Sequence, residues 1–259
     1  MTIQLKKTLD LAEGYRSILW FILLTIICAI PFFILKKIIH FQESTLTDLF
    51  GYAVPHILFI FFLVKRFDLQ SEKSKIKPSA INYLITLGGA IVVMFLLDPL
   101  VTLFHLPDFI SWKSYKTEQI SCFNGIHVVV FAPILEEIIF RQIILKQFLK
   151  KYSPTQAIIH SSLIWAIIHF NPIQSVTVFL FGLFIGWVYY KTQSIWPCIL
   201  IHMVNNLANF LLMFYLKTEV VSFYSLFQGN YLLYAAIYMI SIGLIILLIK
   251  SLKGETVSI

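Results

Sequence analysis

The chain has 259 residues, of which 59% are apolar, 16% aromatic and 13% charged, and its mean hydropathy is +0.84. Soluble domains carry about 25% charged residues, so this composition excludes an ordinary soluble protein. The formal net charge of +7 does not indicate a nucleic-acid ligand, because the basic residues are scattered between apolar windows. The three cysteines have neither disulfide nor metal-ligand spacing.

Long uncharged windows follow one another along the chain. They cover residues 17–35, 49–64, 78–97, 119–135, 152–190, 192–216 and 220–249. A bilayer-spanning helix takes about 20 apolar residues, so the windows predict membrane spans. The window 152–190 would be about 58 Å long as one helix, roughly twice the hydrocarbon thickness. It must therefore fold back, and Asn171-Pro172 provides the break, because a proline disfavours helix in the residue before it.

These windows predict an all-α, polytopic membrane protein of about eight transmembrane helices, with the active site inside the bundle. The predicted helices span 17–36, 46–65, 79–104, 122–149, 154–170, 173–190, 195–216 and 229–250. The connections on the side of the N-terminus carry 14 basic residues and those on the other side carry 5. Positive charge favours the cytoplasmic side, so both termini are predicted to lie in the cytoplasm of a multi-pass protein of the cell membrane. One membrane domain is expected over residues 1–259.

Ionisable residues inside membrane spans are costly and are therefore candidates for function. The candidates within the predicted spans are His56, Asp98, His127, Glu136, Glu137, Arg141, His160, His169, His202, Asn205, Asn206 and Asn209.

The fourth predicted helix carries two adjacent glutamates. Neighbouring helical positions diverge by about 100°, so both carboxylates cannot face one partner, whereas Glu137 and Arg141 are one turn apart and can pair. We expect this ion pair to fix the local geometry and leave Glu136 facing a cavity. The alternative is an interhelical salt bridge without chemistry. Pro133, one turn earlier, is expected to kink the helix.

The fifth predicted helix places Ser162, Trp165 and His169 on one stripe, because separations of four and seven residues return to nearly the same azimuth. His160 lies nine residues from His169 and therefore on another face, so only one of the two histidines can join a given site.

The seventh predicted helix carries a polar stripe of His202, Asn206 and Asn209 through an apolar segment. Asparagines in membrane spans can serve as interhelical hydrogen-bonding groups. An imidazole and an amide one turn apart can also stabilise a developing oxyanion.

These residues allow two kinds of chemistry, and both are hydrolytic. In the first, Glu136 is a general base that activates water while a histidine and Asn206 stabilise the oxyanion. In the second, Glu136, His169 and His202 bind a catalytic zinc ion and leave a fourth position for water. The HExxH signature is absent, so spacing does not decide for a metal.

Three motifs follow in order on successive hydrophobic helices: Glu136-Glu137-x-x-x-Arg141, Trp165 to His169, and His202-x-x-x-Asn206. Together they resemble the CPBP family of intramembrane proteases, which includes the type II CAAX prenyl endopeptidases and bacterial bacteriocin-processing and self-immunity proteins. The resemblance covers a core of roughly 120–215. The first three predicted helices carry no family motif.

The resemblance implies that Glu136, His169, His202 and Asn206 are catalytic and that Glu137, Arg141 and Trp165 support them. The family commonly has Phe where Trp165 stands, which affects the shape of the pocket rather than the chemistry. It implies an intramembrane endopeptidase, metal-assisted if zinc is bound, that cleaves a membrane-associated or lipophilic peptide or protein.

The abundance of Ile, Phe and Lys is typical of a low-GC bacterial chain. Peptide maturation, signalling and bacteriocin immunity are therefore the expected roles, with membrane lipid and a peptide or protein substrate as partners. The alternatives are a non-catalytic immunity or regulatory scaffold and a proton-coupled transporter that uses the same ionisable residues as a relay.

Overall fold

The computed structural model describes residues 7–39, 45–69, 80–103, 125–216, 227 and 230–252, and within these ranges all regular structure is helical. The described residues form eight helices, as predicted. They are α1 (Leu11–Ile39), α2 (Thr45–Arg66), α3 (Ala80–Leu103), a continuous fourth helix from residue 125 to Leu149, α7 (Pro154–Ile167), α8 (Pro172–Thr192), α9 (Ile195–Leu216) and α10 (Tyr231–Leu252). The fourth helix is divided by its hydrogen bonding into η3 (His127–Phe131), α5 (Ala132–Glu137), η4 (Ile138–Leu145) and α6 (Lys146–Leu149).

The predicted reversal inside the window 152–190 is confirmed. The helix α7 ends at Ile167, three residues before its predicted end, and α8 begins at Pro172. Phe170 has a positive φ of 52° and Asn171 is extended, so the chain leaves the helical conformation just before the proline. The two helices then pack against each other along their length.

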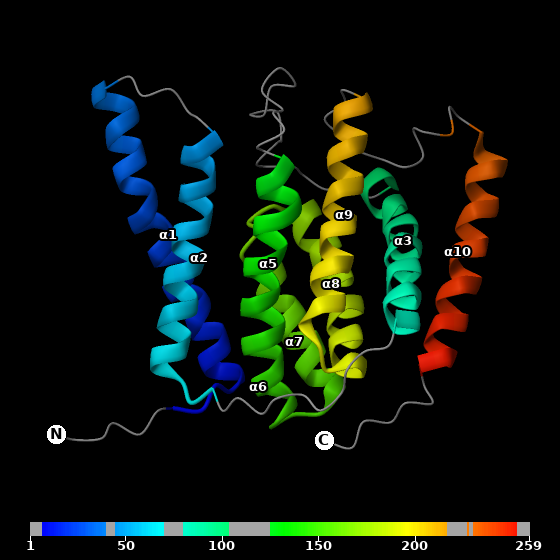
Figure 1. Cartoon of the computed structure of the whole chain (residues 1–259), viewed down its shortest axis with the longest axis horizontal. Helices are drawn as coiled ribbons and strands as arrows, with labels where there is room; N and C mark the ends of the chain where they lie inside the picture. Colours follow the sequence, from blue (N-terminus) through cyan, green and yellow to red (C-terminus); the bar gives the residue numbers. More distant parts are fainter. Residues whose placement is uncertain are drawn as a thin grey trace.

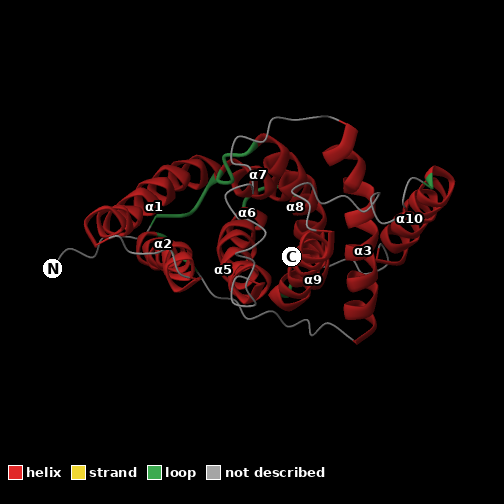
Figure 2. Ribbon diagram, turned by 90° about the horizontal axis from the view of Figure 1, so that it is seen from above, coloured by secondary structure: helices red, strands yellow, loops and turns green. Residues whose placement is uncertain are grey.

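The helices form a row of three groups (Figures 1 and 2). The pair α1 and α2 lies at one end, α3 and α10 lie at the other, and the fourth helix with α7, α8 and α9 fills the centre. The segment α5 contacts both α2 and α9. The two glutamates of α5 therefore lie where the central group meets the α1–α2 pair.

Three of the described helices are long and apolar enough to cross a membrane: Leu11–Pro31, Pro172–Thr192 and Ile195–Phe214. Shorter apolar stretches occupy Leu87–Asp98 and Tyr231–Leu247. Large apolar side chains are also exposed on the outer helices, as at Leu19 and Leu232. These features indicate a multi-pass membrane protein, while the eight spans and the cytoplasmic termini stay predictions.

Candidate active site

The helix that carries both glutamates departs from regular α-helical hydrogen bonding on each side of them. In η3 the Ala132 N–H donates to the carbonyl of His127, and after η4 the Lys146 N–H donates to the carbonyl of Arg141, five residues back in each case. Such π-helical turns occur frequently at functional sites. Pro133 is one cause, since it has no N–H to donate.

Glu137 is the centre of a buried polar cluster. Its Oε2 lies 3.2 Å from Arg141 Nε, and its Oε1 lies 2.9 Å from His202 Nδ1 on α9. Glu137 and Arg141 are almost completely buried. The predicted ion pair between Glu137 and Arg141 is therefore confirmed. His202 joins this pair, rather than contacting Glu136 as the grouping of the catalytic candidates implied.

The contact with Glu137 also determines which nitrogen of His202 is free. A carboxylate accepts hydrogen bonds, so Nδ1 of His202 carries the proton that points to Glu137. The opposite nitrogen, Nε2, is then the atom that His202 offers to other groups. This is the arrangement in which a carboxylate fixes the tautomer of an imidazole.

The carboxylate of Glu136 is held in place by side chains of neighbouring helices. Glu136 is only 7% exposed, and both of its oxygens accept hydrogen bonds from other helices. Oε2 accepts from Trp165 Nε1 of α7 at 2.6 Å, and Oε1 accepts from the Tyr52 hydroxyl of α2. The two donors hold the carboxylate between α2 and α7.

Trp165 links the surroundings of the two glutamates. Its ring is buried, and the guanidinium carbon of Arg141 lies 4.1 Å from the ring centroid. The ring of His202 meets the indole edge-on at 5.2 Å, and the ring of His169 does so at 6.0 Å. One indole thus donates to Glu136, covers the cation that pairs with Glu137 and touches both candidate histidines.

His169 lies in the turn just after α7, beside Trp165 and half-buried. Its Nδ1 is 2.9 Å from the carbonyl of Trp165, and because a carbonyl only accepts, Nδ1 is the donor, while Nε2 makes no hydrogen bond to the described residues. His160 instead lies 2.8 Å from the Tyr15 hydroxyl of α1. The prediction that the two histidines lie on different faces is confirmed.

Asn206 donates to a backbone carbonyl that Pro133 leaves without a helical donor. The carbonyl of Val128 loses its α-helical donor, because the Ala132 N–H bonds to His127, and its π-helical donor would be Pro133, which has no N–H. Asn206 Nδ2 donates to this carbonyl at 2.8 Å. One amide hydrogen of Asn206 is therefore used to join α9 to η3, and the second is left for another acceptor.

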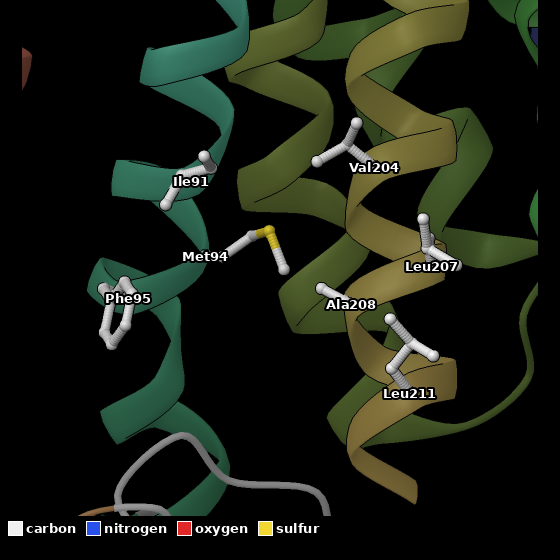
Figure 3. A pocket seen from close by; sticks show the side chains of 7 residues that line it. All are labelled: Ile91, Met94, Phe95, Val204, Leu207, Ala208 and Leu211. Atoms are coloured by element: carbon white, nitrogen blue, oxygen red, sulfur yellow. The ribbon is translucent and has the colours of Figure 1, made fainter. Parts of the chain in front are cut away.

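Two other features lie apart from this cluster. Asp98 of α3 accepts a 2.6 Å hydrogen bond from Tyr234 of α10, at the far end of the row of helices. An apolar groove of about 240 Å³ runs between α3 and α9 (Figure 3). The α9 side of the groove includes Val204 and Ala208. These residues are two and six positions after His202, or about 200° and 240° around the helix, so they lie on the face opposite His202.

The described residues form no group of three His, Cys, Asp or Glu side chains that could hold a metal ion. Glu136 is hydrogen-bonded to Trp165 and Tyr52, while His202 pairs with Glu137. As they stand, the proposed zinc ligands Glu136, His169 and His202 do not form a metal-binding group.

Tyr52 is a residue of this site that the sequence did not indicate. The candidates were the charged, imidazole and amide side chains inside the apolar windows, and the phenol of Tyr52 is none of these. His56 is the residue that could have drawn attention to Tyr52. It lies one turn after Tyr52, so the two polar side chains share one face of α2.

Buried carboxylates held by side chains of neighbouring helices define a polar centre within a largely apolar bundle. Residues 118–208 match the family described as Rce1-like, type II CAAX prenyl endopeptidase. This segment is an Rce1-like CAAX prenyl endopeptidase domain, so the resemblance is confirmed over this range. Comparisons with curated proteins and with solved structures find no match. The matched segment includes every residue of the three motifs and excludes Tyr52.

Proposed function

We propose that this protein is an intramembrane endopeptidase that hydrolyses a peptide bond with water activated by Glu136. The observation that carries the proposal is the buried cluster in which Trp165 joins Glu136 to the Glu137–Arg141 pair, all within the Rce1-like segment. A purely structural salt bridge would need only Glu137 and Arg141. It would not explain why Glu136 is also buried and is oriented by donors of its own.

Glu136 is the proposed general base. A carboxylate can accept about four hydrogen bonds, and Trp165 and Tyr52 use two of them, so Glu136 can still accept one from water. The carboxylate removes a proton from that water, the water oxygen bonds to the carbonyl carbon, and the proton later passes to the leaving amine as the C–N bond breaks. His169, with Nε2 free, is proposed to orient the same water.

His202 and Asn206 are proposed to stabilise the oxyanion. They lie one turn apart on α9, and Asn206 retains one amide hydrogen after its bond to Val128. In its doubly protonated form His202 would donate from Nδ1 to Glu137 and from Nε2 to the oxyanion, and the contact with Glu137 would fix the direction of that second bond. Donors that are positioned before the reaction stabilise developing charge without reorganising.

The proposed substrate is a membrane-associated or lipophilic peptide or protein. The site lies among apolar helices, so a polar soluble peptide would have to leave water to reach it. We propose roles in peptide maturation, in signalling or in immunity to bacteriocins.

Zinc assistance is a second form of the proposal. In its favour, Nδ1 of both histidines is bound to an oxygen, of Glu137 for His202 and of the Trp165 carbonyl for His169. Metal-ligating histidines usually make such a second contact. Binding would require the side chains of Glu136 and the histidines to move together.

The alternatives predict other results. A proton relay would use Asp98 together with Glu136, yet Asp98 pairs with Tyr234 on the distant α3–α10 pair. A scaffold would not depend on the charge of Glu136.

The test is cleavage of lipophilic peptides by the purified protein, read by mass spectrometry. The Glu136→Gln variant should give no product, while Glu13→Gln should cleave at the wild-type rate. Glu13 is a matched control because it is also a buried glutamate but pairs with Arg16 and Arg66 at the start of α1. Cleavage by Glu136→Gln would disprove the proposal.

A further inference from the structure

We infer that the α1–α2 pair completes the active site, with Tyr52 as a positioning residue for Glu136. This inference rests on the proposed function. Tyr52 lies outside the Rce1-like segment, yet its hydroxyl donates to Oε1 of Glu136 across 84 positions of sequence. It is one of the two described donors that orient this carboxylate.

The ring of Tyr52 is held between two imidazoles. His56, one turn later on α2, stacks on it with centroids 4.0 Å apart, and His127 of η3 meets it edge-on at 4.8 Å. His56 donates from Nδ1 to the carbonyl of Tyr52 at 2.7 Å and packs against Phe21 of α1. The phenol is therefore fixed by α1, α2 and η3 before it reaches Glu136.

A fixed phenol matters because a general base must be placed accurately. Displacement of a catalytic group by about 1 Å can cost about 10²-fold in rate. Trp165 of α7 donates to Oε2 and Tyr52 of α2 donates to Oε1. With one donor alone the carboxylate could still rotate, and the second donor restricts that rotation. Loss of the Tyr52 hydroxyl leaves Glu136 with one of these donors.

Tyr15 provides a matched control. Its hydroxyl also joins the α1–α2 pair to the central helices, at 2.8 Å from Nδ1 of His160 on α7. His160 faces away from the stripe that carries Trp165. Removal of the Tyr15 hydroxyl therefore weakens the same packing without touching Glu136.

The experiment compares kcat and KM of the wild type with those of Tyr52→Phe and Tyr15→Phe, on a lipophilic peptide that the wild type cleaves. Phe keeps the ring between the two imidazoles, so Tyr52→Phe should fold. Its kcat should fall about 10- to 100-fold with KM within about twofold, because Tyr52 orients the base and does not bind substrate. Tyr15→Phe should retain the wild-type kcat. Replacement of Tyr52 by 4-aminophenylalanine, which restores an N–H donor, should recover kcat above that of Tyr52→Phe.

Three results would overturn the inference: a wild-type kcat in Tyr52→Phe, an equal loss in both Phe variants, or no recovery with 4-aminophenylalanine. The Glu136→Gln variant separates this inference from the proposed function. If that variant remains active, the glutamate mechanism itself fails. If it is inactive while Tyr52→Phe is fully active, only the role of Tyr52 fails.

Discussion

The single substitutions Glu136→Gln and Glu137→Gln should lower the free energy of unfolding by different amounts. In Glu137→Gln the buried Arg141 loses its counter-charge, and none of its guanidinium nitrogens makes a hydrogen bond to the described residues. Breaking a buried ion pair from one side costs about 3 to 5 kcal/mol. The single amide oxygen of Gln can accept from His202 or from Arg141 but not from both, so one of these two donors then faces the amide NH2.

Glu136→Gln should be tolerated. Trp165 can still donate to the remaining carbonyl oxygen, and the Tyr52 hydroxyl can turn to accept from the amide, because a hydroxyl both donates and accepts. The Tyr52 O–H then loses its acceptor, so we expect the free energy of unfolding to fall by about 1 to 2 kcal/mol, less than in Glu137→Gln.

The assay is unfolding by denaturant in detergent micelles, followed by tryptophan fluorescence. Arg141→Gln and the double variant Glu137→Gln/Arg141→Gln complete a double-mutant cycle, in which contacting residues should show a coupling of about 0.5 to 3 kcal/mol. The double variant should be more stable than Glu137→Gln because no unpaired guanidinium remains. Equal destabilisation by Glu136→Gln and Glu137→Gln, or additive effects in the cycle, would refute the reasoning.

Three further predictions concern topology, zinc and the oxyanion. Reporter fusions after Lys75 should report the cytoplasm and fusions near Lys116 the outside; the reverse result would contradict the predicted orientation. If zinc takes part, purified protein should hold it stoichiometrically and lose it in His169→Ala and His202→Ala; active metal-free protein would exclude that form of the proposal. Asn206→Ala should lower turnover by about 10² to 10³, or roughly 2.7 to 4 kcal/mol, with little change in substrate affinity, whereas a wild-type rate with earlier melting would make Asn206 a purely structural link to η3.

The sequence by itself determined those features that depend on neighbours along the chain. The uncharged windows predicted the eight helices, and Asn171-Pro172 predicted the reversal between α7 and α8. The pair Glu137 and Arg141 followed from their separation by one turn. The ion pair could be predicted because a helix fixes the relative direction of its own side chains.

The tertiary structure decided how the helices are rotated against one another, and with it the partners of the site. His202 meets Glu137 across 65 positions, and Tyr52 meets Glu136 across 84. Periodicity along one helix gives no information about the rotation of its neighbour. The π-helical turns on each side of the glutamates also change the angle between residues before and after them, so a period of 3.6 residues per turn does not hold over the whole length of this helix.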